Sequence, residues 1–250
     1  APFIGAGPAR VPEETTMTRA LAILTLVAAV AFAASPFLSG GFNGFSADQF
    51  PRPQVDPPIQ PAGYAFSIWG VIYLWLIAGT GFGLVARADA PDWRAGRAPL
   101  FLSLAIGSVW IAVAQASVIV ATVLIWVMLV TALAALLRAG TEDRWLQREP
   151  VGAYAGWLTA AASVSIGLVL AGYGVTSQIV AAYAGLGLAL AIAARIQRLR
   201  PDSLAYPAAV IWALVGVIVA NLTPLTPGVL ALAVAGIAYL AVMMLRRARA

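Results

Sequence analysis

The sequence predicts an all-α membrane protein, a helical bundle with about eight transmembrane helices. Of its 250 residues, 62% are hydrophobic and only 10% are charged, whereas a soluble domain has about 25% charged residues. The hydrophobic residues form runs of the length that a bilayer requires, about 20 residues each. The charged residues lie almost entirely between these runs, as loops between membrane helices would.

The composition also excludes several kinds of chemistry. The chain has no cysteine and no histidine. It therefore has no disulfide and no thiolate or imidazole metal ligand, and it lacks the usual acid–base group near neutral pH. All 15 basic residues are arginines, and they lie in short loops that indicate membrane topology rather than nucleic-acid binding. We expect no metal site and no catalytic residues.

The first part of the chain comprises residues 1–16 and one hydrophobic run. Residues 1–16 are polar and rich in proline, so we expect an irregular tail. Met17 to about Leu38 forms the first span. The small residues around Ala31-Phe32-Ala33 also fit a signal-peptide cleavage site, but we favour a helix that is retained.

A long loop follows, residues 39–62, rich in glycine and proline. Connections in helical bundles usually have 2–8 residues. This one also contains three phenylalanines, Phe42, Phe45 and Phe50. It could fold over the helix ends as a lid, or dip into the lipid headgroups, and the sequence leaves both possibilities open.

The remaining spans follow from run length. The second extends from about Gly63 to Ala86. The hydrophobic stretch Pro99–Arg138 is too long for a single span, so we divide it near Ala116–Val118 into two. Four further spans are expected at about Pro150–Gly172, Gln178–Arg195, Ala205–Asn221 and Pro227–Leu245.

The arginines set the expected orientation. With eight spans, 14 of the 15 arginines fall on one side of the membrane and only Arg52 on the other. Cytoplasmic loops of membrane proteins carry the excess of arginine. We therefore expect both termini in the cytoplasm and the protein in a bacterial inner membrane.

The stretch from Pro57 to Trp75 is the most distinctive part of the chain, with prolines followed by a cluster of aromatic residues. Phe66, Trp69 and Tyr73 have the spacing of one helix face. Tyrosine and tryptophan also collect where membrane helices cross the interface, so anchoring alone is one explanation of the cluster.

These residues also resemble a family signature. Gly63, Tyr64 and Phe66 follow a proline-rich loop, and Trp69 and Tyr73 are four residues apart. The pattern is similar to that of the tryptophan-rich sensory protein family, which includes the mitochondrial translocator protein (peripheral benzodiazepine receptor). The chain departs from it at Tyr64, where short members have tryptophan, and by one residue missing between Phe66 and Trp69.

Weaker similarities follow in the family's order through residue 172. They are Trp110 in the third helix, Leu124-Ile125-Trp126 in the fourth, and Pro150, Tyr154, Trp157 and Ala161 in the fifth. Gly107 and Ser165 stand where the family commonly has asparagine. The resemblance covers five spans, residues 17–172, and leaves out the last three.

The resemblance implies a five-helix unit that binds tetrapyrroles, sterols or drug-like aromatic molecules beneath the first loop. It implies a pocket lined by Tyr64, Phe66, Trp69, Tyr73, Trp110, Trp126, Tyr154 and Trp157. Aromatic side chains can stack on a flat macrocycle, so the expected ligand is a tetrapyrrole such as a porphyrin, or another pigment or sterol-like polycycle, and no cofactor is assigned with certainty. The alternative is that these rings only pack the bundle or anchor it.

We therefore divide the chain into a tail (1–16), a five-helix translocator-protein-like unit (17–174) and three further helices (175–250). The last three are rich in small residues, which favour close helix contacts. We expect them to form an interface with the bundle or another subunit, and not to bind the ligand.

The predicted function is a regulatory or carrier protein for a hydrophobic aromatic ligand. The alternative is a structural or accessory subunit of a larger membrane complex, for example a photosynthetic one. An enzyme is the least favoured reading, because the spans carry no acidic residues of the kind that mark proton chemistry in membranes. Lipids, the ligand and other subunits are the expected partners.

Overall fold

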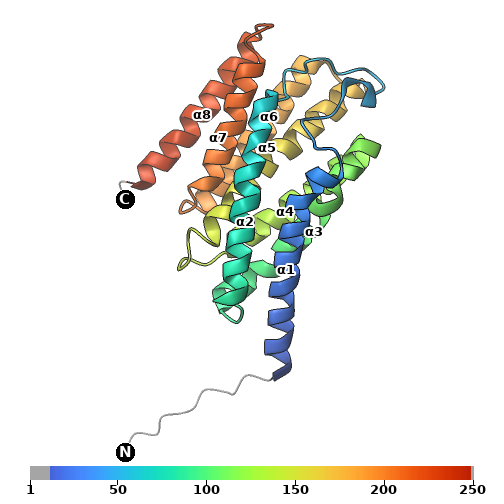
Figure 1. Cartoon of the computed structure of the whole chain (residues 1–250). Helices are drawn as coiled ribbons and strands as arrows, with labels where there is room; N and C mark the ends of the chain where they lie inside the picture. The colour runs from blue at the N-terminus through green and yellow to red at the C-terminus, as the bar shows by residue number, and fades with distance from the viewer. Residues whose placement is uncertain (1–11, 249–250) are drawn as a thin grey trace, which may run out of the picture.

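A computed structural model describes residues 12–248 of the chain (Figure 1). Within these residues the regular structure is helical, and no strand extends beyond one isolated bridge. The helices are α1 (Pro12–Leu38), α2 (Ile68–Val85), α3 (Pro91–Ala116), α4 (Val118–Arg138), α5 (Arg148–Gly172), α6 (Gln178–Leu199), α7 (Ala205–Ala220) and α8 (Pro227–Ala248), with short 3₁₀ helices η1 (Ala47–Gln49) and η2 (Gly63–Ser67). The predicted all-α bundle is confirmed.

Seven of these helices are long and apolar enough to cross a membrane. The exception is α7, whose 16 residues extend about 24 Å, less than the hydrocarbon thickness of about 30 Å. The predicted division of the long hydrophobic stretch is confirmed: α3 ends at Ala116, α4 begins at Val118, and extended Ser117 joins them. The Ser117 hydroxyl accepts a hydrogen bond from Val120 N, 3.3 Å away.

Two helices begin well ahead of the predicted start. α1 begins at Pro12 and α3 at Pro91, ahead of the predicted starts at Met17 and Pro99. Residues 12–16 of the predicted tail are therefore helical, and residues 1–11 lie outside the described part. Both helices begin with proline, whose fixed φ and missing N–H suit the first helical position.

α5 is the central helix of the bundle. Of its apolar window 67% is buried, compared with 22% for α8 at the periphery. It packs against α4, α6, α7 and α2. Glycine permits its close approach to α7, because a Cβ at Gly156 would lie only 2.2 Å from the Tyr206 carbonyl oxygen. Such close backbone contact is how helices associate where water provides no driving force.

The loops that carry arginine gather at one end of the bundle, together with the end of α8 (Figure 1). Arg87, between α2 and α3, contacts Asp143, between α4 and α5, at 2.8 Å. Burial raises the pKa of Asp143, but hydrogen bonds from Trp93 and Arg87 outweigh it and lower the pKa overall. Arg200, after α6, donates to the Ala139 carbonyl oxygen at 2.9 Å.

A buried carboxylate fastens α5 to α7 at this same end. The Glu149 side chain is fully buried. Its Oε2 accepts hydrogen bonds from the backbone N–H groups of Leu204 (2.9 Å) and Ala205 (2.7 Å), and Arg144 Nε lies 2.7 Å from its Oε1. The first N–H groups of a helix lack partners within the helix, and the positive end of its dipole attracts an anion. Glu149 therefore holds the start of α7.

We predict that Glu149→Ala lowers the free energy of unfolding by about 3 kcal/mol, because two backbone donors and an arginine lose a charged acceptor. Chemical unfolding in detergent micelles, followed by circular dichroism, measures the change. Glu142→Ala is the matched control, since Glu142 is exposed in the same connection and its loss should change stability little. Equal effects of the two substitutions would contradict the role of Glu149.

Candidate ligand-binding site

The α1–α2 loop (residues 39–62) folds over the helix ends as a lid. Its Phe45 and Phe50 side chains are buried in the core. Gln49 Nε2 donates to the Ala114 carbonyl oxygen at the end of α3, 2.9 Å away, and Gln115 Nε2 donates to the Ser39 carbonyl oxygen. These polar contacts hold the loop on the tip of the α3–α4 hairpin.

A cavity of about 330 Å³ lies beneath the loop, among α1 to α5. Five of the eight predicted residues line it, namely Phe66, Trp69, Tyr73, Trp110 and Trp157. A smaller cavity of about 40 Å³ shares Phe66, Trp110 and Trp157 and extends to Ala213 on α7. α7 thus lines the smaller cavity, although not the larger one, and the division into five and three helices did not predict this.

The aromatic rings of the wall pack against one another at defined angles. Trp69 and Tyr73 are stacked, with ring centroids 5.1 Å apart. Trp157 meets Trp69 edge to face at 6.1 Å and Phe66 at 5.7 Å. Edge-to-face and offset-stacked pairs are the favourable geometries for aromatic side chains, so the wall is preorganised.

Phe32 of α1 also lines the cavity, and the sequence reasoning missed it. Its ring lies 5.0 Å from that of Tyr73 and 5.4 Å from that of Trp69, edge to face in both cases. The only signal in the sequence was that the first span, otherwise mostly aliphatic, carries two phenylalanines, Phe32 and Phe37, in its second half.

Three predicted residues do not line this cavity. Tyr64 is 45% exposed, and its ring lies against that of Trp212, with centroids 5.7 Å apart. Phe66 lines the cavity, but Tyr64 is two residues earlier in the same 3₁₀ helix and therefore points in a different direction. Tyr154 is fully buried and its hydroxyl is hydrogen-bonded to Ser103 Oγ at 2.8 Å. Trp126 is partly buried on α4 and packs against the core.

Several indole N–H groups of the bundle have an acceptor. Trp93 donates to Asp143 (2.9 Å), Trp110 to the Ala121 carbonyl oxygen (2.8 Å) and Trp212 to the Ala65 carbonyl oxygen (2.8 Å). Within residues 12–248, by contrast, nothing accepts a hydrogen bond from the indoles of Trp69 or Trp157 or pairs with the Tyr73 hydroxyl. The cavity wall, which is apolar apart from Asn43, thus carries three side chains whose polar atoms make no hydrogen bond within the described residues.

A family model described as TSPO-like protein matches residues 17–246. The chain belongs to the TSPO-like protein family. The match confirms the resemblance seen in the motifs and extends it, because it includes the last three helices, which those motifs left out. No curated protein and no solved structure matches the chain.

This TSPO-like protein carries Gly107 where the sequence comparison expected asparagine, and the structure gives a steric reason. A Cβ at Gly107 would lie 2.9 Å from two carbons of the Phe32 ring and 3.1 Å from the Met128 methyl group. The Phe32 ring therefore occupies the space that a side chain at position 107 would need. Phe32 and Gly107 form a complementary pair at the cavity wall.

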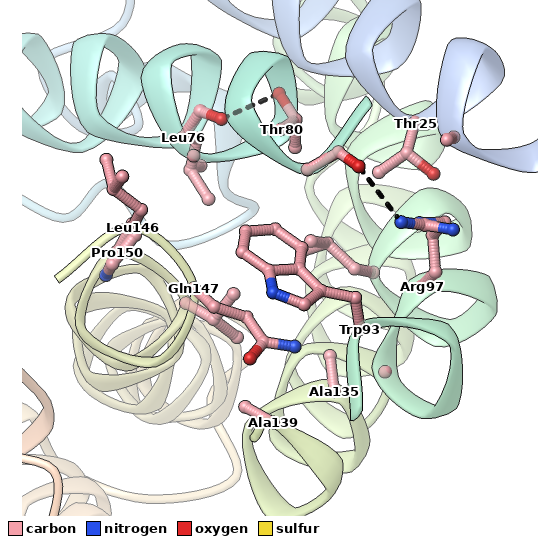
Figure 2. Close-up of a pocket in the computed structure, with 16 residues that line it drawn as sticks. Thr25, Leu76, Thr80, Trp93, Arg97, Ala135, Ala139, Leu146, Gln147 and Pro150 are labelled. Atoms are coloured by element: carbon pink, nitrogen blue, oxygen red, sulfur yellow. Dashed lines mark hydrogen bonds between the residues drawn. The ribbon is translucent and has the colours of Figure 1, made fainter. Parts of the chain in front are cut away.

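A further cavity lies at the arginine-rich end of the TSPO-like bundle, and none of the eight predicted residues lines it. Figure 2 shows the Trp93 indole lying between Gln147 and Arg97. The Arg97 side chain donates to the carbonyl oxygens of Ala88 (2.6 Å) and Arg87 (3.0 Å). At about 40 Å³ this cavity has room for a water molecule or two, not for an aromatic ligand.

We predict that Gly107→Asn alone lowers the free energy of unfolding by about 1–3 kcal/mol, because it overpacks the site against Phe32. The double variant Gly107→Asn/Phe32→Ala should lose less free energy of unfolding than the two single variants lose together, because the asparagine can occupy the space that the Phe32 ring vacates. A double-mutant cycle of unfolding in detergent measures this coupling. Strict additivity would mean that the two positions do not compete for the same space.

Proposed function

We propose that this TSPO-like protein binds a flat, hydrophobic aromatic ligand, foremost a porphyrin-type tetrapyrrole, in the cavity beneath the α1–α2 loop, and that it acts as a regulator or carrier rather than an enzyme. The observation that carries the proposal is the cavity of about 330 Å³. Its volume is within the range of small-molecule sites, about 300–1,000 Å³. The alternative role, as an accessory subunit of a larger complex, stays a prediction.

The lining chemistry defines the ligand further. No charged side chain lines the cavity, so charged groups of a ligand belong at the mouth, where Phe37 and Asn43 are exposed. The ring faces of Trp69 and Trp157 suit a planar π-system. Their N–H groups and the Tyr73 hydroxyl are free to bond a ligand, so they favour one with acceptor atoms within its apolar part.

We predict that purified protein quenches the fluorescence of added protoporphyrin saturably. The double variant Trp69→Ala/Trp157→Ala should weaken binding by about 1–3 kcal/mol, by analogy with the loss of aromatic stacking on a planar base. This corresponds to an increase in Kd of about 5- to 150-fold. Titration of the porphyrin signal gives the Kd directly.

Trp145→Ala is the matched control, because Trp145 is 61% exposed and does not line the cavity. Trp157→Phe separates two contributions, since phenylalanine keeps a ring and removes the N–H donor. Saturable binding with the same Kd in the double variant and the control would place the porphyrin site elsewhere.

We also propose that the arginine-rich end faces the cytoplasm of a bacterial inner membrane. The support is the gathering of the α2–α3, α4–α5 and α6–α7 connections at that end, together with the general excess of arginine in cytoplasmic loops. The α1–α2 loop and the cavity would then lie toward the opposite face.

Reporter fusions after Ala88, Thr141 and Pro201 should therefore give cytoplasmic signals, because these positions follow α2, α4 and α6. A fusion after Gly40, in the α1–α2 loop, should report the other side. Paired alkaline phosphatase and green fluorescent protein fusions measure both locations. A phosphatase signal at any of the first three positions would refute this orientation.

A further inference from the structure

Residues 58–65, the end of the α1–α2 loop and the beginning of η2, lie alongside α7. Three hydrogen bonds join this 58–65 segment to α7. Asn221 Nδ2 donates to the Pro58 carbonyl oxygen at 2.7 Å, Ala62 N donates to the Gly216 carbonyl oxygen at 3.0 Å, and Trp212 Nε1 donates to the Ala65 carbonyl oxygen at 2.8 Å. The segment runs antiparallel to α7, because its first residue bonds the end of the helix and its last residue bonds the middle.

The steric fit between the segment and α7 is close. A Cβ at Gly216 would lie 2.8 Å from the Cβ atoms of both Pro61 and Ala65, so only glycine leaves room for the segment at this level. The Trp212 ring also meets the Tyr64 ring edge to face at 5.7 Å. Backbone contact, side-chain hydrogen bonds and ring packing all act on the same eight residues.

The segment is anchored on its other flank by Ile59, which is 2% exposed. A Cβ at Gly167 of α5 or at Gly185 of α6 would lie within 2.3 Å of Ile59 Cδ1. The Ile59 side chain therefore fills a slot between two glycines on neighbouring helices. α6 and α7, which the sequence reasoning set apart from the cavity, therefore help to position this part of the loop.

The segment continues directly into the residues that line the cavity. Phe66 follows Ala65 immediately, and Trp69 lies in the next turn. The backbone hydrogen bonds within the segment are few, from Ala65 N to the Ala62 carbonyl oxygen and from Gln60 N to that of Pro57, each 2.9 Å. Its position therefore depends on α7 more than on its own conformation.

We propose that Trp212 and Gly216 of α7, and Asn221 directly after it, are positioning residues for the ligand cavity. They hold the 58–65 segment in place and with it Phe66 and Trp69 in the cavity wall, so widening the cavity for ligand exchange requires the segment to leave α7. The effect of α7 on ligand exchange rests on the proposed ligand-binding function. The contact between the segment and α7 does not depend on that function, so the two are tested by separate measurements.

Gly216→Ala tests the proposal without changing a polar group. The added Cβ would lie 2.8 Å from the Cβ atoms of both Pro61 and Ala65, so it should push the segment away from α7. We expect protoporphyrin release to become about three- to ten-fold faster in stopped-flow fluorescence. Gly187→Ala is the matched control, because a Cβ at Gly187 of α6 would meet no atom within 4 Å.

Trp212→Phe provides a second perturbation, because it keeps a ring beside Tyr64 and removes the N–H donor. It should speed porphyrin release by about three- to ten-fold, the effect of one lost hydrogen bond of typical strength. Trp145→Phe, far from the segment in sequence and exposed, should leave release unchanged. Release rates in Gly216→Ala and Trp212→Phe that equal the wild-type rate would overturn the role of α7 while leaving porphyrin binding intact.

Hydrogen–deuterium exchange measures the docking without any ligand. Trp212→Phe should raise the exchange rate of the Ala62 amide, which is bonded to Gly216, while amides in the middle of α4 stay protected. If the wild-type protein fails to bind protoporphyrin, the proposed function fails, and a raised exchange rate still supports the docking. An unchanged rate at Ala62 overturns the docking whatever the porphyrin result.

Discussion

The Glu149 carboxylate fixes the start of α7, and the end of the α1–α2 loop lies against that helix. At the arginine-rich end, Glu149 accepts hydrogen bonds from the first N–H groups of α7. At the other end, α7 contacts the 58–65 segment through Gly216 and Asn221. Because the helix is rigid, fixing its first residues also fixes where its later residues lie along the bundle axis. One buried acidic side chain thus influences where Phe66 and Trp69 lie, although it is far from both.

The fold class and the number of helices could be predicted because both follow from the length of hydrophobic runs. The turn at Ser117 could be predicted for the same reason, since no single membrane helix accommodates the whole stretch. The beginnings of α1 and α3 could not. Polar and charged residues such as Asp92 and Arg94 end a hydrophobic run but are compatible with a helix, so helices extend beyond the apolar layer that the sequence pattern marks.

The candidate site was predictable where its residues share one helix face or belong to the family pattern. Trp69 and Tyr73 follow from helical spacing, and Trp110 and Trp157 came from the family pattern. Phe32 and Gly216 could not be predicted. Phe32 belongs to a helix without a motif, and Gly216 is one of many small residues in its helix. Their roles depend on contacts with residues that are distant in the chain, such as Trp69 for Phe32 and Ala65 for Gly216. Tyr64 was predicted from the motif but does not line the cavity. It lies two positions before Phe66 in a 3₁₀ helix, so its ring points toward Trp212 instead.

The proline content of the 58–65 segment has a consequence for membrane depth. Trp212 and Asn221 are nine positions apart on α7, roughly 13 Å at about 1.5 Å per residue, so the segment descends by that distance beside the helix. Non-helical backbone at such depth is tolerated only where protein satisfies its polar groups. Pro57, Pro58 and Pro61 carry no N–H, so the chain enters the water-poor layer with fewer donors to satisfy. Here proline does more than break a helix: it makes an irregular backbone compatible with the interior of a bilayer.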